Sequence, residues 1–122
     1  MSFQLRWTPQ ATETFEGLQQ AAKRAADAAA KRASAGEGKE RKSSKQEGLF
    51  KQVAKAVRLL GENPRHTGLH THEYDSLEHP FDKDAKVFEA YAQNRTPGAY
   101  RIFWCYGPGK GDITIIAITP HP

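Results

Sequence analysis

The chain has 122 residues, of which 38% are hydrophobic and 26% charged, with 18 basic and 14 acidic side chains. This length fits a single domain that can bury a core without disulfide staples. The lone Cys105 excludes an internal disulfide, the N-terminus lacks a signal-peptide pattern, and no apolar run approaches the ~20 residues that span a bilayer. We therefore expect a cytoplasmic domain that is neither secreted nor inserted in a membrane.

The N-terminal residues predict a strand that leads into a helix. Apolar and polar side chains alternate over Phe3–Trp7, as in a half-buried strand. Thr8 followed by Pro9 is typical of a helix start, with threonine as the N-cap. Phe15 and Leu18 begin one helical face that continues with alanine alone. Because alanine buries little area, we expect the far end of this helix to be weakly anchored and to project from the body.

A second helix is predicted by its capping residues and its apolar stripe. Two overlapping capping-box patterns begin at Ser43 and Ser44. An apolar stripe with helical spacing then runs over Phe50–Leu60. Gly61 stands where a C-cap glycine belongs, and Pro64 prevents the helix from continuing. The two helices would form a hairpin with arms of unequal length.

The net charge of +4 is concentrated in one stretch, residues 19–47, which holds eight basic and four acidic side chains. We interpret this stretch as a basic, alanine- and lysine-rich extension of the helical hairpin, with a mobile loop over residues 34–42. Two interpretations remain open for its charge. The basic side chains bind the phosphates of a nucleic acid, or they form a solvated face that provides solubility.

The C-terminal half changes to a period typical of strands. Strand-forming segments rich in β-branched and aromatic residues are Leu69–Tyr74, Val87–Ala92, Tyr100–Tyr106 and Asp112–Thr119. The glycine-rich segment Gly107–Gly111 joins two of them and lacks a Walker pattern, so we interpret it as a hairpin turn. The sequence therefore predicts a single α+β domain over residues 1–122, with two layers: an N-terminal strand, a long helical hairpin and an antiparallel β-meander.

Histidines are the residues best suited to proton transfer near neutral pH, and four of the five lie within fourteen residues: His66, His70, His72 and His79. The fifth, His121, follows the last predicted strand. A simple hairpin would place Arg101 opposite Ile118, roughly 10 Å along the strand from His121 at ~3.3 Å per residue. A phosphate and its sugar would fit between two such groups.

These residues also have simpler interpretations. His70 and His72 would be ordinary surface or backbone-bonded histidines, and Arg101 would be the cross-strand partner of Glu89. A metal site is a third interpretation of the His-x-His pair, but no second compact cluster accompanies it, so we predict no metal and no cofactor. Cys105 lies inside a strand and is expected to pack rather than react.

Three stretches give the chain a resemblance to the RelE/ParE superfamily of bacterial type II toxins. They are NPRHTGLHTH at Asn63–His72, AYRIFW at Ala99–Trp104 and ITIIAITPH at Ile113–His121. The resemblance implies a RelE-like fold, in the histidine-using branch of mRNA-cleaving toxins. It also implies a cognate antitoxin as partner, and RNA as substrate, which in some members is bound on the ribosome.

The resemblance further assigns roles to individual residues. It implies a catalytic set of His70, His72, Arg101 and His121, in which one histidine is a base, another is an acid, and the arginine stabilises the charged phosphorane. The reaction would be metal-free attack of a ribose 2′-hydroxyl on the adjacent phosphate. Basic residues expected to contact the RNA are Arg65, Lys86 and Arg95.

The superfamily leaves a second functional class open. It contains ParE-like topoisomerase inhibitors, and the fold also serves non-catalytic binding. The long helical hairpin favours this alternative, whereas the histidines and Arg101 favour an endoribonuclease. The chain ends at Pro122 without the tail that carries a catalytic tyrosine in some ribosome-dependent toxins.

Overall fold

The computed structural model describes residues 2–34, 44–94 and 97–120. Apart from Ser34, the loop predicted over residues 34–42 lies outside these ranges. The elements in chain order are β1 (Gln4–Trp7), α1 (Pro9–Ser34), α2 (Lys45–Glu62), the 3₁₀ helix η1 (Thr67–Leu69), β2 (His72–Glu73), β3 (Phe88–Tyr91), β4 (Tyr100–Tyr106) and β5 (Asp112–Pro120). The predicted α+β order of a strand, two helices and a meander is confirmed.

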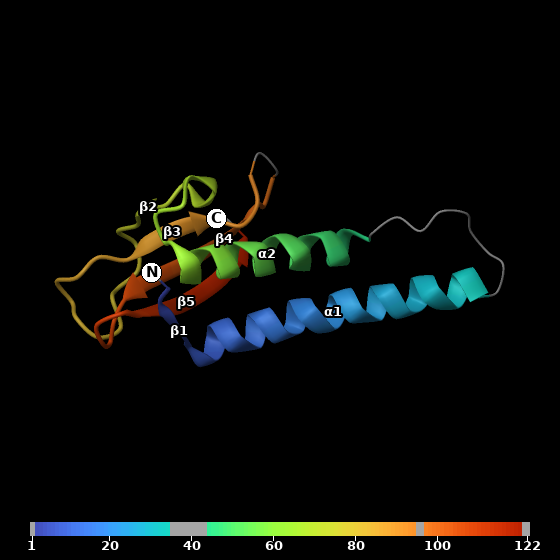
Figure 1. The fold of residues 1–122 in the computed structure, drawn as a ribbon, viewed down its shortest axis with the longest axis horizontal. Coiled ribbons are helices and arrows are strands. Elements are labelled where there is room, and N and C mark those ends of the chain that lie inside the picture. The colour runs from blue at the N-terminus through green and yellow to red at the C-terminus, as the bar shows by residue number, and fades with distance from the viewer. Residues whose placement is uncertain (1, 35–43, 95–96, 121–122) are drawn as a thin grey trace.

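The five strands form one sheet in the order β1-β5-β4-β3-β2. β1 pairs with β5 in parallel, and the other pairs are antiparallel, so the sheet is mixed. Helices α1 and α2 lie side by side as a hairpin against the sheet, and the longer α1 extends well beyond it (Figure 1). Ala22 is the last buried residue among the described side chains of α1, which agrees with the predicted weak anchoring of its far end.

Thr8 joins β1 to α1 as the predicted N-cap. Its Oγ1 accepts a hydrogen bond from the backbone N–H of Ala11 at 3.1 Å and donates one to the carbonyl of Ile116 at 2.6 Å. The helix start is thereby fixed to β5. Beside it, the rings of Trp7 and Phe15 lie 5.1 Å apart, which anchors the first turns of α1.

Helix α2 begins as predicted and ends differently. Ser44 and Glu47 form the capping box, with both reciprocal hydrogen bonds present. The predicted C-cap at Gly61 is wrong, because the helix continues to Glu62 and Asn63 is the cap. Gly61 is instead a place of close approach to β1. Its carbonyl accepts a 2.7 Å hydrogen bond from Phe3, and an added Cβ would lie 3.3 Å from Leu5 Cδ1.

The core lies between the helices and one face of the sheet. Buried residues of α2 meet buried sheet residues in one cluster, which includes Val53, Leu60, Phe88, Ala90, Ile102, Trp104, Ile113 and Ile115. Side chains alternate between the two faces of a strand. The residues between these on β3 and β4, such as Glu89 and Arg101, therefore lie on the opposite face, away from the helices. None of the helices, among the described residues, is long and apolar enough to cross a membrane.

A β-bulge shifts the register between β4 and β5. Phe103 pairs with Ala117 but Trp104 pairs with Ile115, which leaves Ile116 as the extra residue. Arg101 therefore lies opposite Thr119, and the predicted pairing with Ile118 is wrong by one residue. The bulge also lets Ile113, Ile115 and Ile118 all join the core, although their spacing does not alternate strictly.

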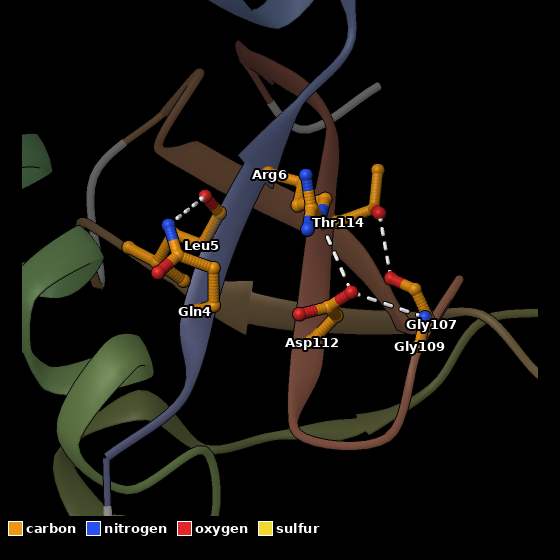
Figure 2. A network of polar contacts seen from close by, with 7 residues as sticks. All are labelled: Gln4, Leu5, Arg6, Gly107, Gly109, Asp112 and Thr114. Carbon is orange, nitrogen blue, oxygen red and sulfur yellow. Dashed lines mark hydrogen bonds and ion pairs between the residues drawn. The ribbon is translucent and has the colours of Figure 1, made fainter.

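The segment Gly107–Gly111 is the hairpin turn that the sequence predicted. Asp112 Oδ2 accepts hydrogen bonds from Gly109 N at 3.1 Å and Arg6 Nε at 3.0 Å, which ties the turn to β1 (Figure 2). Thr114 donates to the carbonyl of Gly107 at 2.8 Å. Because hydrogen bonds within the protein hold Gly107 and Gly109, we interpret this turn as structural.

Candidate functional site

Tyr91, the last residue of β3, is the centre around which several predicted site residues gather. Its half-buried ring belongs to the sheet face away from the helices. The ring centroids of His70 and His72 lie 5.2 and 5.8 Å from that of Tyr91. The guanidinium carbon of Arg101 lies 3.7 Å from the same centroid. The structure thus brings His70, His72 and Arg101 together around one aromatic ring.

Arg101 is a buried cation, with only 7% of its surface exposed. Its Nη1 donates to the carbonyl of Gln93 at 2.6 Å and to that of Tyr100 at 3.3 Å. Among the described residues its Nε has no hydrogen-bond partner and no carboxylate forms an ion pair with it. The alternative in which Glu89 is its cross-strand partner is wrong, because Tyr91 is opposite Arg101 in the register.

His70 is placed by a short loop that follows α2. Leu69 is fully buried and anchors η1, and Thr71 donates to the carbonyl of Pro64 at 2.8 Å. His70 itself has a left-handed backbone with φ of 49°, which is uncommon for a residue other than glycine. Such a conformation persists where the surroundings impose it and is enriched at functional sites. Here it turns the chain so that the ring meets Tyr91.

His72 is held on two sides in β2. Its Nε2 lies 2.7 Å from Glu89 Oε1, and its Nδ1 lies 3.0 Å from the carbonyl oxygen of His70. The two partners differ in exposure, because the His72 side chain is 47% exposed and that of Glu89 only 2%. The register explains this pair, since His72 and Glu89 are opposite each other in the β2–β3 ladder.

An apolar hollow of about 290 Å³ lies on the same face of the sheet, and its walls include Tyr74, Phe103, Ala117 and Thr119. The rings of Tyr74 and Phe103 are 4.6 Å apart. Thr119 is the register partner of Arg101, but the residues that line the hollow do not include Arg101, Tyr91 or the two histidines.

Two of the predicted RNA-binding residues, Arg65 and Lys86, make contacts away from Tyr91. Arg65 lies over the ring of Phe88, 5.5 Å from its centroid, and Phe88 belongs to the core on the helix side. Lys86 forms a 2.8 Å ion pair with Glu73, and this hydrogen bond raises the pKa of Lys86. The structure therefore does not bring Arg65 or Lys86 to Tyr91. Arg95 and His121 lie outside the described residues, so their placement remains a prediction.

Two other potentially reactive side chains, those of His79 and Cys105, are buried. His79 is buried; its Nε2 donates to the carbonyl of Tyr106 at 2.9 Å, while its Nδ1 accepts from Phe81 N and Asp82 N, each at 3.1 Å. Cys105 is fully buried, as predicted, and burial raises the pKa of its thiol to about 11. Within the described part of the chain, no three histidine, cysteine, aspartate or glutamate side chains are arranged to hold a metal ion.

Sequence reasoning missed Tyr91 and Glu89 as members of this site. Both lie in the predicted strand segment Val87–Ala92, two residues apart and hence on one face. The available signal was a charged residue inside an otherwise apolar strand. A glutamate there needs a partner if it is buried, and the nearby His72 was a candidate.

Chemically, the site combines two imidazole rings, a guanidinium, an aromatic ring and one buried carboxylate. Imidazole can take up or release a proton near neutral pH, and guanidinium matches the geometry of phosphate oxygens. Both histidines are exposed, whereas Arg101 lies beneath Tyr91. The arrangement can hold an anion at the protein surface and move a proton next to it.

No family model and no curated protein matches the sequence. Solved structures do match over nearly the whole chain. A chain of the archaeal RelE–RelB complex from Pyrococcus horikoshii OT3 is 13% identical, with a TM-score of 0.53, over 98% of this chain and 96% of that one. The YoeB/ParE toxin from Agrobacterium tumefaciens is 9% identical, with a TM-score of 0.58, over 98% and 99%.

The YoeB dimer from Staphylococcus aureus is similar as well, with 11% identity, a TM-score of 0.53 and coverage of 100% of both chains. All three likenesses extend over β1, the helical hairpin and the meander. At these identities a likeness establishes architecture. The chain has the fold of the RelE, YoeB and ParE toxins, as its sequence motifs predicted.

Proposed function

We propose that this protein is the toxin of a toxin–antitoxin pair and that it cleaves RNA at the site around Tyr91 without a metal ion. The observation that carries the proposal is the convergence of His70, His72 and Arg101 on one ring. Ribose-assisted cleavage needs a group that can accept the 2′-hydroxyl proton, placed beside positive charge that stabilises the phosphorane. The fold shared with solved RelE, YoeB and ParE structures adds support from architecture.

In the proposed reaction, the 2′-hydroxyl oxygen attacks the adjacent phosphorus. A histidine accepts the hydroxyl proton, the bond from phosphorus to the 5′-oxygen breaks with its electron pair, and that oxygen takes up a proton. The products are a 2′,3′-cyclic phosphate and a 5′-hydroxyl. Arg101 stabilises the added negative charge on the phosphorane. The role predicted for His121 as a further acid or base stays a prediction.

The partner in this proposal is a cognate antitoxin protein. Its support is that the Pyrococcus horikoshii structure is of a RelE–RelB complex. RNA, free or on the ribosome, is the proposed substrate. The contribution of Arg65, Lys86 and Arg95 to RNA binding remains part of the proposal.

The test compares the purified wild type with His70→Ala and Arg101→Ala on RNA, with and without ribosomes, in the presence of EDTA. His66→Ala is the matched control, because His66 is an exposed histidine of the same loop whose Nδ1 is bonded to Gly68 N at 3.0 Å. We expect cleavage by the wild type and the control, and loss in the two site variants. Absence of cleavage under every condition would contradict the proposal.

A ParE-like topoisomerase inhibitor is the second candidate, favoured by the long α1, which runs over Pro9–Ser34 and extends beyond the sheet (Figure 1). This candidate predicts inhibition of DNA gyrase supercoiling by the wild type. The inhibition would persist in His70→Ala and would be lost when the distal part of the hairpin is removed. Measuring supercoiling in parallel with RNA cleavage separates the two functions.

A further inference from the structure

The two ring nitrogens of His72 both face hydrogen-bond acceptors. Nδ1 is 3.0 Å from the carbonyl oxygen of His70, and Nε2 is 2.7 Å from Glu89 Oε1. From this geometry we infer that Glu89 holds His72 as a fixed imidazolium, which forms a two-cation phosphate site with Arg101. His70 is then the histidine that exchanges protons. The inference rests on the proposed function for its substrate, a phosphodiester.

The hydrogens on the two ring nitrogens of His72 follow from the groups to which these nitrogens are bonded. A carbonyl oxygen only accepts, so Nδ1 of His72 must carry hydrogen to bond that of His70. A carboxylate also only accepts, so Nε2 carries hydrogen when Glu89 is ionised. A ring with hydrogen on both nitrogens is the imidazolium. It has no lone pair left to accept a proton, and therefore His72 is not the base.

The competing arrangement is a neutral His72 beside a protonated Glu89. Arg101 argues against it, because its cross-strand partner Tyr91 is two residues from Glu89 on the same face. Arg101 is therefore a diagonal neighbour of Glu89, and a positive charge there attracts a carboxylate but not a neutral carboxyl group. The carboxylate is 98% buried, so it needs a charged, hydrogen-bonded partner, and His72 supplies it.

His70 has the opposite surroundings. Its ring contacts Tyr91 and, among the described residues, makes no hydrogen bond through either nitrogen. The residue is exposed, so a ring nitrogen is available to a substrate. In the proposed cleavage, the 2′-hydroxyl proton goes to His70 as the oxygen bonds to phosphorus. The 5′-oxygen leaves with its electron pair and takes a proton from solvent, and His72 keeps both of its protons.

The charged groups around His72 are few in the part of the chain that the structure describes. Glu89 contacts the ring directly, Arg101 lies over the ring of Tyr91, and His70 contributes its carbonyl and its own ring. When His70 is neutral, the sum of these charges with His72 is positive. Because both N–H groups of His72 are bonded within the protein, a phosphate near its ring would be attracted by the charge of His72 and by that of Arg101, and not through a hydrogen bond from His72.

The first test is the protonation of the ring nitrogens, measured by ¹⁵N NMR on the full chain at pH 7. We expect both nitrogens of His72 to carry hydrogen in the wild type, and one of them to lose it in Glu89→Gln. Glu73→Gln is the matched control, since Glu73 is the next residue along and pairs with Lys86. An unprotonated nitrogen of His72 in the wild type would overturn the inference, whether or not any variant folds.

The second test is binding of inorganic phosphate, followed by the ¹⁵N signals of the His70 ring, which the wild type and both His72 variants retain. His72→Gln should weaken binding by about tenfold, as for the loss of one nearby positive charge. His72→Lys, which keeps a positive charge, should recover most of the affinity, and failure to do so would overturn the two-cation site. Cleavage lost in His70→Ala but largely kept in His72→Lys supports the division of roles. If the wild type has the protonated ring and binds phosphate but cuts no RNA, the proposed function and the role of His70 fail, while the phosphate site stands.

Discussion

The guanidinium carbon of Arg101 lies 3.7 Å from the ring centroid of Tyr91, the residue opposite it in the β3–β4 ladder. This stacking holds a cation that the described residues do not pair with a carboxylate. Carbonyl oxygens of Gln93 and Tyr100 hold its Nη1 from the side. The position of Arg101 is thus set by an aromatic face and the backbone, and not by a carboxylate of the described residues.

Tyr91 should act as a positioning residue through its ring rather than its hydroxyl. Tyr91→Phe keeps the ring, so we expect a change in unfolding free energy within about 0.5 kcal/mol and nearly normal RNA cleavage. Tyr91→Ala removes aromatic burial and the cation–π contact, which should cost about 2 kcal/mol. Urea unfolding and cleavage assays measure both. Equal loss of cleavage in the two variants would instead assign the hydroxyl a direct role.

Arg101 should contribute to the reaction rate through its fork of donors. We expect Arg101→Ala to lower cleavage by about 10²–10³-fold, as for the loss of one group that stabilises transition-state charge. Arg101→Lys should recover only part of the rate, because an ammonium lacks the bidentate geometry and the flat surface that stacks on Tyr91. Single-turnover rates on one RNA substrate give the comparison. Full activity in Arg101→Lys would show that charge alone suffices.

Most of the fold could be predicted because its signals are local. The alternation in Phe3–Trp7, the capping box at Ser44 and the β-branched segment Asp112–Thr119 each depend on neighbours in the sequence. The bulge at Ile116 could not be predicted, because Ile115 and Ile116 are both apolar and nothing in the sequence marks which of them lacks a partner on β4. The C-cap at Gly61 was mispredicted because glycine also serves close packing, and only the position of Leu5 distinguishes the two.

The candidate site divides in the same way. His70, His72 and Arg101 could be proposed because the histidines cluster in one stretch of the sequence and the resemblance assigns roles to these positions. Tyr91 and Glu89 could not, because their roles depend on which residue lies across the ladder. Tyr91 faces Arg101, and Glu89 faces His72. Such pairing is a property of the register, which the sequence of one strand does not specify.

His79 should stabilise the segment between β2 and β3 by joining three backbone groups. His79→Ala leaves the carbonyl of Tyr106 and the N–H groups of Phe81 and Asp82 without this partner. We expect a loss of about 1–3 kcal/mol in unfolding free energy, as for buried polar groups left unsatisfied. Faster hydrogen exchange of the two amides would localise the effect. His66→Ala, at an exposed position, should change the stability much less.

Cys105 should be chemically inert in the folded protein. Burial raises the pKa of its thiol to about 11 from a reference of 9.0, so the neutral form is favoured in the fold. A raised pKa in the folded state gives stability that is complete below the unfolded value and is lost as pH rises from 9 toward 11. We expect no reaction with a thiol reagent at pH 8 until urea unfolds the chain. Cys105→Ala should reduce the decline of stability above pH 9, and rapid labelling of the native protein would contradict the burial.

Two glycines of α2 should respond differently to alanine, which tests the close approach of the helix to β1. Gly48 has open space where a Cβ would be, so Gly48→Ala should stabilise the protein by about 0.5–1 kcal/mol through helix propensity. At Gly61 the new Cβ would lie 3.3 Å from Leu5 Cδ1, and Leu5 packs against the core. The strain should cancel or exceed the same gain in propensity. If Gly61→Ala stabilises the protein as much as Gly48→Ala, β1 is free to move away from α2. If contact with Leu5 causes the difference, adding Gly61→Ala to the Leu5→Ala variant should recover part of the gain in helix propensity.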